Sequence, residues 1–184
     1  MRLFVALDIP EVVRTAIETL IGELKPFDDS WKWVRAVNLH VTLKFLGEVA
    51  PDRLAKIVEA LRTAPAHGPV ALKFHGLGLF PNERKARVLW VGMDAPQSLA
   101  GLAAAVEAAL AGIGFAPEER EFAPHLTLAR IKNETTAPQL REAIAKLSTR
   151  QFATTEASAF HLIESRIKST GPEYTTLESF PLTR

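Results

Sequence analysis

A four-residue pattern, histidine followed by an apolar residue, threonine and leucine, occurs twice in the chain and constrains its fold more than any other feature. Residues 40–43 read His-Val-Thr-Leu, and residues 125–128 read His-Leu-Thr-Leu. Two of the five histidines are therefore followed by the same kind of tripeptide, which independent residue frequencies would rarely produce. Self-similarity of this kind indicates a chain built from two related halves.

The spacing of this pattern places its two polar residues on one face of a strand. Along a strand, residues i and i+2 point to one side, whereas i+1 and i+3 point to the other. His40 and Thr42 would therefore share one face, while Val41, Leu43 and Phe45 would face an apolar core. Two such strands side by side would line one open surface with two histidines and two threonines.

Apolar periodicity along the rest of the chain predicts strands and helices of irregular length. The predicted strands are residues 3–9, 31–35, 39–46, 70–79, 87–93, 125–131, 174–180 and the run 152–167. The predicted helices are residues 12–24, 51–61, 98–111 and 138–147. Because these lengths do not repeat as regular βαβ units, they favour an α+β fold with mostly antiparallel sheet. No linker separates two domains, so residues 1–184 are expected to form a single domain.

Composition removes several kinds of chemistry from consideration. The chain has 184 residues, of which 47% are hydrophobic and 23% are charged, as in ordinary globular proteins. It contains no cysteine, which excludes thiolate catalysis, cysteine-ligated zinc, iron–sulfur clusters and disulfides. The lack of cysteine is also compatible with a reducing cytoplasm, where we expect the protein to act.

Net charge and the N-terminal segment limit the partners. A formal net charge of +1 argues against a broad basic surface that coats duplex nucleic acid, but it leaves RNA ends and nucleotides open. The first apolar run, residues 3–7, is too short for a signal-peptide core or a membrane span. We therefore expect no membrane partner, and we expect a monomer.

Paired histidines and threonines suit the hydrolysis of a phosphodiester. This reaction needs a base for the water proton, an acid for the departing oxygen, and donors for the non-bridging oxygens. An imidazole has an unperturbed pKa of roughly 6.5, so one neutral and one protonated copy can coexist near neutral pH. Each threonine hydroxyl can donate to a phosphoryl oxygen. Two histidines on opposite sides of phosphorus would allow in-line displacement without a metal.

The two motifs resemble the paired HxT motifs of the two-histidine phosphoesterase superfamily. The similarity extends to RLFVALDIP, WVRAVNLHVTLKFLGEV, RVLWVGM, FAPHLTLAR and GPEYTTLESFPL. With these segments, the chain resembles the bacterial and archaeal RNA 2′,3′-cyclic phosphodiesterases, also called RNA 2′,5′-ligases, over nearly its whole length. Both HxT motifs are intact.

The resemblance implies a fold and a reaction. The expected fold has two pseudo-symmetric lobes, each a mostly antiparallel sheet with outer helices, around a central groove. The expected reaction converts RNA 2′,3′-cyclic phosphate ends to 2′-phosphomonoesters without a metal or other cofactor, and members of the family also join or cleave 2′,5′ linkages. By carry-over, His40 is the proton donor and His125 the proton acceptor, while Thr42 and Thr127 bind the phosphate.

Two cations follow the motifs. Lys44 continues the alternation of His40 and Thr42 and could face the same groove. Arg130 lies three residues after Thr127, so it is out of phase unless the strand twists or bulges. The resemblance nevertheless includes an arginine at this place, and we expect Arg130 to bind phosphate.

Other interpretations of the sequence stay open. The remaining histidines lack a threonine partner and suggest ordinary packing, whereas the tryptophans could stack a nucleobase or pack a core. These residues are His67, His75, His161, Trp31, Trp33 and Trp90. Two other functions also remain: a non-catalytic module that binds RNA ends or nucleotides, and a metal-dependent phosphodiesterase. The second lacks the HExxH spacing and an obvious cluster of carboxylates.

Overall fold

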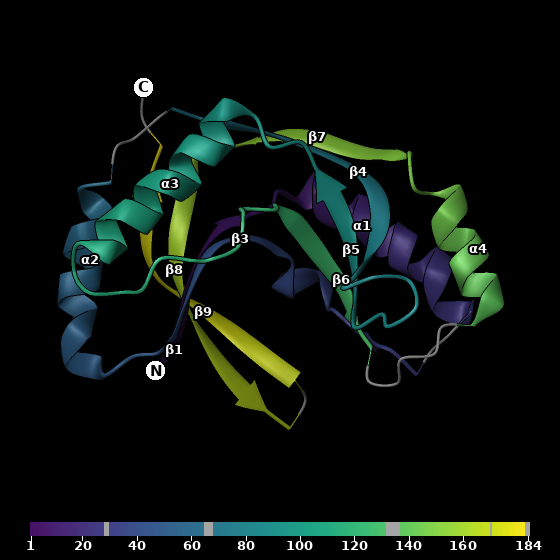
Figure 1. Cartoon of the computed structure of the whole chain (residues 1–184), viewed down its shortest axis with the longest axis horizontal. Helices are drawn as coiled ribbons and strands as arrows, with labels where there is room; N and C mark the ends of the chain where they lie inside the picture. Colours follow the sequence, from purple (N-terminus) through teal and green to yellow (C-terminus); the bar gives the residue numbers. More distant parts are fainter. Residues whose placement is uncertain (28–29, 65–67, 132–136, 170, 183–184) are drawn as a thin grey trace.

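The computed structural model describes residues 1–184 except 28–29, 65–67, 132–136, 170 and 183–184 (Figure 1). Its helices are α1 Glu11–Leu24, α2 Leu54–Arg62, α3 Gln97–Ala111 and α4 Pro138–Lys146, with short 3-10 turns at Lys25–Phe27, Ala36–Asn38 and Pro51–Arg53. Its strands are β1 Arg2–Asp8, β2 Lys32–Trp33, β3 His40–Glu48, β4 Val70–Phe80, β5 Val88–Met93, β6 His125–Arg130, β7 Gln151–Ala157, β8 Ala159–Lys168 and β9 Gly171–Pro181.

The strands form two antiparallel sheets, and the strand that carries a histidine motif occupies an equivalent place in each. One sheet runs β3-β1-β8-β9, and the other runs β2-β6-β5-β4-β7. Setting aside the short strand β2, each sheet begins with a strand that carries a histidine motif and continues with three antiparallel neighbours. The predicted α+β class, with two related and mostly antiparallel halves, is confirmed.

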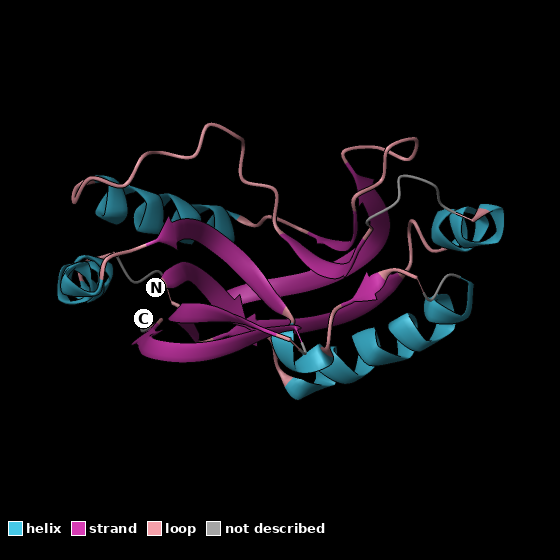
Figure 2. Ribbon diagram, turned by 90° about the horizontal axis from the view of Figure 1, so that it is seen from below, coloured by secondary structure: helices cyan, strands magenta, loops and turns pink. Residues whose placement is uncertain are grey.

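The helices lie outside the sheets, and two of them, α1 and α3, contact the sheet of the other half. Figure 2 shows the strands in the middle of the molecule with helices at its edges. Helix α1 follows β1 of the first sheet but packs against β7 of the second sheet. Helix α3 follows β5 of the second sheet and contacts both β3 of the first sheet and β4 of the second. One hydrophobic cluster contains buried residues of both sheets, such as Leu7 of β1 and Leu72 of β4. The two halves therefore share one hydrophobic core, to which helices α1 and α3 both contribute.

Local sequence accounts for the faces that these elements bury. In α1, Val13, Ile17, Leu20 and Leu24 recur at helical spacing and are all buried. Strand β1 is central in its sheet, and its residues 3–7 are buried on both faces. One of these faces carries Phe4, whose ring packs beside the first histidine motif.

Two predicted strands differ from the structure. The strand predicted at 31–35 is reduced to Lys32–Trp33, because this segment pairs only with the end of β6. The run predicted over 152–167 is divided at Ser158 into β7 and β8, which belong to different sheets. Both differences come from the partner strands, which local periodicity does not specify.

Candidate active site

Both motif strands contain a β-bulge at the same place. The pairing of β3 with β1 skips Leu43, and the pairing of β6 with β5 skips Leu128, in each case the residue after the motif threonine. A bulge shifts the alternation of side chains by one residue. Phe45 in β3 and Arg130 in β6 therefore return to the face that carries the histidines.

The bulge in β3 overturns two expectations. Alternation predicts Lys44 on the histidine face, but this residue is only 6% exposed, and its Nζ donates to Glu107 Oε1 at 2.7 Å and to the carbonyl of Ala116 at 2.8 Å. Alternation also predicts Phe45 in the core, but Phe45 is 61% exposed. Both predictions are wrong, because strict alternation ignores the extra residue at Leu43.

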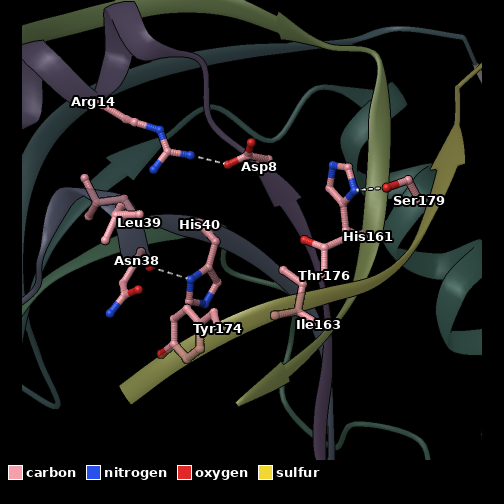
Figure 3. A pocket seen from close by; sticks show the side chains of 11 residues that line it. Asp8, Arg14, Asn38, Leu39, His40, His161, Ile163, Tyr174, Thr176 and Ser179 are labelled. Carbon is pink, nitrogen blue, oxygen red and sulfur yellow. Dashed lines mark hydrogen bonds and ion pairs between the residues drawn. The ribbon is translucent and has the colours of Figure 1, made fainter. Parts of the chain in front are cut away.

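The two motif histidines have the same hydrogen bond. His40 Nδ1 lies 2.8 Å from the carbonyl oxygen of Asn38 (Figure 3), and His125 Nδ1 lies 2.8 Å from the carbonyl oxygen of Ala123. Since a carbonyl can only accept, Nδ1 carries the proton in both rings. The second ring nitrogen, Nε2, is thereby left for proton transfer in each half.

The predicted site residues share one surface. Thr42 and Thr127 are half-buried and follow the phase of the motif histidines, while the residues between them are buried. Strand β3 contacts β6, and the charges of Arg130 and His125 both lower the pKa of His40. The structure therefore places His40, His125 and Arg130 within electrostatic range of one another, with Thr42 and Thr127 on the same strand faces as the two histidines.

His40 lies in aromatic surroundings. Its ring centroid is 4.7 Å from that of Phe4 and 5.2 Å from that of Tyr174, which packs edge-on. Burial is the largest influence and lowers the pKa of His40, whereas the Asn38 carbonyl and the Asp8 carboxylate act in the opposite direction. Burial also raises the pKa of Tyr174, so its phenol stays protonated. The neutral form of His40 is therefore favoured in the free protein.

A cavity lies beside each motif histidine. The cavity at His40 has a volume of about 270 Å³ and is shown in Figure 3. Its lining includes His161, whose Nδ1 is 2.9 Å from Ser179 Oγ, and Asp8, which pairs with Arg14. The cavity at His125 has a volume of about 420 Å³, and its lining includes Phe80 and Trp90.

Of the other histidines and tryptophans that the structure describes, some line the two cavities and others pack in the core. His161 lines the cavity at His40 and His75 lines the cavity at His125, although no local motif marks either residue. Trp31 is buried in the core and stacks with Trp33, with ring centroids 5.8 Å apart. Trp90, in contrast, lines the cavity at His125. His67 lies outside the described residues.

Within the described ranges, no group of three or more histidine, aspartate or glutamate side chains is arranged to hold a metal ion. No helix in the described part of the chain has both the length and the apolar composition needed to cross a membrane.

Two α+β halves that each bring a histidine and a threonine to one surface define a phosphoesterase of the two-histidine class. A family model described as LigT like Phosphoesterase matches the chain twice, over residues 7–90 and 91–174, with one motif in each match. The chain belongs to this family.

Relatives and solved structures agree with this assignment. The chain is 34% identical to the RNA 2′,3′-cyclic phosphodiesterase of Methanothermobacter thermautotrophicus, covering 99% of both chains. It is 36% identical to the protein of the same name in Archaeoglobus fulgidus, covering 98% of this chain and 99% of the other. The crystal structure of a Thermus thermophilus protein, TT0787, superimposes with a TM-score of 0.84 at 32% identity, covering 99% of this chain and 98% of that one. LigT of E. coli complexed with 3′-AMP gives 0.81 at 28% identity, covering 100% and 98%.

Proposed function

We propose that this protein is an RNA 2′,3′-cyclic phosphodiesterase that forms 2′-phosphomonoesters by acid–base catalysis with two histidines. The observation that carries the proposal is the duplicated imidazole geometry, in which a backbone carbonyl holds Nδ1 of both His40 and His125 and leaves Nε2 for proton transfer. The relatives named RNA 2′,3′-cyclic phosphodiesterase, which match over nearly their full length, support the same substrate.

In the proposed reaction, water attacks phosphorus while the bond to the 3′ oxygen breaks. His125 takes the proton from water, and His40 gives a proton to the departing 3′ oxygen, so the phosphate remains on the 2′ oxygen. Thr42 and Thr127 donate to the non-bridging oxygens, where negative charge grows. The guanidinium of Arg130 adds a fixed positive charge to the same oxygens.

The lowered pKa of His40 has a consequence for this assignment. A proton donor must be protonated when the substrate binds, but burial favours the neutral form of His40 in the free protein. A cyclic phosphodiester carries one negative charge, and an adjacent anion raises the pKa of an imidazole. Substrate binding would therefore help to charge the acid that the reaction uses.

The same chemistry is reversible, and we extend the proposal to RNA 2′,5′ linkages. A 5′ hydroxyl in place of water would give a 2′,5′ phosphodiester, and the reverse step would cleave one. We further propose that residues 1–184 act as a single two-lobed domain, as a monomer, in the cytoplasm, on RNA ends or nucleotides with a 2′,3′-cyclic phosphate.

A product assay with a chelator tests the proposal. The protein would be incubated with a nucleoside 2′,3′-cyclic phosphate, with and without EDTA, and the products compared with authentic 2′- and 3′-monophosphates. We expect the 2′-monophosphate at the same rate in both. A dominant 3′-monophosphate would contradict the substrate orientation, loss of activity in EDTA would favour the metal-dependent alternative, and binding without turnover would favour a non-catalytic module.

A further inference from the structure

The two halves differ sharply at the position across from the motif threonine. In the first sheet Ala6 pairs with Thr42, whereas in the second sheet Trp90 pairs with Thr127. Directly paired residues of neighbouring strands project to the same face. A methyl group therefore lies beside one threonine and an indole beside the other, so the two sides of the shared surface differ in what they can bind.

The sheet is built to hold this indole close to its backbone. Gly78 pairs with Trp90, and a Cβ atom at Gly78 would come within 2.1 Å of the indole ring. A Cβ atom at Gly92 would come within 3.0 Å of the same ring. Any larger residue at Gly78 would displace the ring, so the two glycines allow Trp90 to lie against the strands rather than stand above them.

A second aromatic ring connects Trp90 to the motif histidine. The Phe80 ring centroid lies 5.0 Å from Trp90 and 5.2 Å from His125, against which it packs edge-on. The indole Nε1 is buried and has no hydrogen-bond partner in the described part of the chain. Because this N–H group is buried, only the carbon atoms of the ring are left to contact a ligand in the cavity.

These rings line the cavity of about 420 Å³ beside His125. Its volume falls in the usual range for small-molecule sites, roughly 300–1,000 Å³. Leu77 and Met93 add apolar surface, and His75, whose Nε2 is 2.7 Å from Asp94 Oδ1, adds a polar group at the rim. A cavity with aromatic rings, apolar walls and few polar groups fits a planar heteroaromatic ring such as a nucleobase.

The geometry of the reaction decides which of the two reacting nucleosides places its base in this cavity. This step rests on the proposed function. Because His40 protonates the 3′ oxygen, the ribose of the cyclic phosphate lies on the His40 side of phosphorus. In-line displacement puts the nucleophile on the opposite side, which is that of His125. The cavity at Trp90 and Phe80 is therefore next to the nucleophile and not next to the nucleoside that carries the cyclic phosphate.

We propose that this cavity binds the base of the second nucleoside, whose 5′ hydroxyl replaces water. The 5′ oxygen then bonds to phosphorus while the bond to the 3′ oxygen breaks. His125 takes the hydroxyl proton, and His40 returns a proton to the 3′ oxygen, so no other reactant is needed. Trp90 and Phe80 thus set the balance between transfer to a nucleoside and transfer to water.

The test is a competition between the two nucleophiles. A nucleoside 2′,3′-cyclic phosphate is mixed with increasing adenosine, and the 2′,5′-linked dinucleoside is measured against the 2′-monophosphate. We expect transfer by the wild type to saturate with adenosine. Trp90→Ala should lower the ratio of transfer to hydrolysis about tenfold, as expected for one lost stacking contact, and Trp90→Phe should retain most of it.

Several results would overturn the inference while the proposed hydrolysis of 2′,3′-cyclic phosphates stands. These are an unchanged ratio in Trp90→Ala, hydrolysis without any transfer by the wild type, and a raised KM for the cyclic phosphate at an unchanged ratio. The last result would place the base of the cyclic phosphate in this cavity. If Trp90→Ala does not fold, Phe80→Leu and Trp90→Phe are compared in the same way.

Tryptophan fluorescence gives a readout that does not depend on turnover. Adenosine should quench the wild type and the control Trp33→Phe, which keeps the cavity intact, but should not quench Trp90→Phe. Equal quenching in all three proteins would reject the cavity as a nucleoside site. Absence of hydrolysis by the wild type would overturn the proposed function instead, and quenching alone would then decide whether a nucleoside binds here.

Discussion

His40 and His125 have the same tautomer, because Nδ1 of each donates to a backbone carbonyl two residues earlier in the chain. This carbonyl belongs to Asn38 for His40 and to Ala123 for His125. Neither arrangement needs a side-chain partner to fix the tautomer. Asn38 is buried, and its Nδ2 donates to the carbonyl of Pro172 at 2.9 Å, which holds the backbone beside His40. Position and tautomer of both imidazoles are thus set by the backbone just before each motif strand.

Removal of the threonine hydroxyls tests the phosphate contacts. Thr42→Val and Thr127→Val keep the β-branched shape but delete one donor each. Loss of an oriented hydrogen bond in a site of this type costs about 3 kcal/mol in the transition state, so kcat/KM should fall roughly a hundredfold in each variant. Steady-state kinetics on a nucleoside 2′,3′-cyclic phosphate measures this. Wild-type values in both variants would remove the threonines from the mechanism.

The environment of His40 gives a test of which histidine is the acid. Tyr174→Ala would open one side of the His40 ring to water, and because burial is the main cause of the lowered pKa of His40, that pKa should rise. If His40 must be protonated, kcat/KM falls as pH increases through its pKa, so the alkaline limb should move to higher pH. Phe45→Ala, which removes an exposed ring that packs on Phe4, is the control.

The position of the limb separates the two assignments. A shift of the acidic limb in Tyr174→Ala, with the alkaline limb fixed, would make His40 the base and reverse the two roles. An unchanged profile in both variants would mean that His40 does not control either limb.

At the scale of the elements, one ion pair ties the first motif strand to the segment that leads to the second. Lys44 of β3 is bound to Glu107 of α3 and to the carbonyl of Ala116, and the Glu118 amide also donates to Glu107 at 3.0 Å. These contacts hold the segment between α3 and β6, which leads to the second histidine. The bulge that turns Lys44 away from the reaction surface thus gives it a structural function.

Glu107→Ala should therefore destabilise the protein. The substitution leaves the Lys44 ammonium, whose side chain is 4% exposed, without its carboxylate. Breaking a buried pair costs about 3 kcal/mol or more, although Glu107 is itself 27% exposed, which places the effect at the lower end. Chemical denaturation measures the loss. Glu142→Ala breaks an exposed pair with Lys146 on α4 and should change stability little, and equal effects in the two variants would contradict this account.

The sequence predicts the motif strands and most of their faces, but not the bulges. His40, Thr42, His125 and Thr127 are located correctly because period-two alternation holds up to the threonine. It fails beyond that residue, since a bulge is a property of two paired strands, and the partners of β3 and β6 are distant in sequence. The sequence also leaves open whether Trp90 stacks a nucleobase or packs in the core, because its position across from Thr127 depends on register.

At the scale of the whole molecule, local sequence patterns also do not predict that α1 and α3 contact the sheet of the other half. Each helix buries a set of apolar residues, but these residues do not say which sheet the helix covers. In the structure α1 packs against β7 of the second sheet, and α3 contacts β3 of the first sheet as well as β4 of the second, so the relative position of the two histidines depends on one shared core.

The stability of the molecule should fall as the pH decreases through the normal range of histidine. Burial lowers the pKa of both His40 and His161 from the ordinary value of 6.5. Above that pH both residues are neutral in the folded and unfolded states. Below it the unfolded chain binds protons more readily, so protonation favours unfolding until the folded pKa is also passed. The Tm measured between pH 8 and pH 5 should therefore decrease.

His161→Gln isolates one part of this effect. It removes one of the two titrating groups and none of the proposed phosphate contacts, so the decrease in Tm across the same pH range should be smaller than in the wild type. An identical decrease in the two proteins would show that His161 does not contribute to the pH dependence.

The most direct measurement of the central claim is the turnover of His40→Ala and His125→Ala on a nucleoside 2′,3′-cyclic phosphate in the presence of EDTA. Each substitution removes a positioned acid or base, and we expect kcat to fall by at least about a hundredfold in each, with circular dichroism and Tm showing that both proteins remain folded. If the two histidines act as a unit, the double variant should be little slower than either single variant. Turnover close to the wild-type rate in either folded single variant would contradict the paired mechanism.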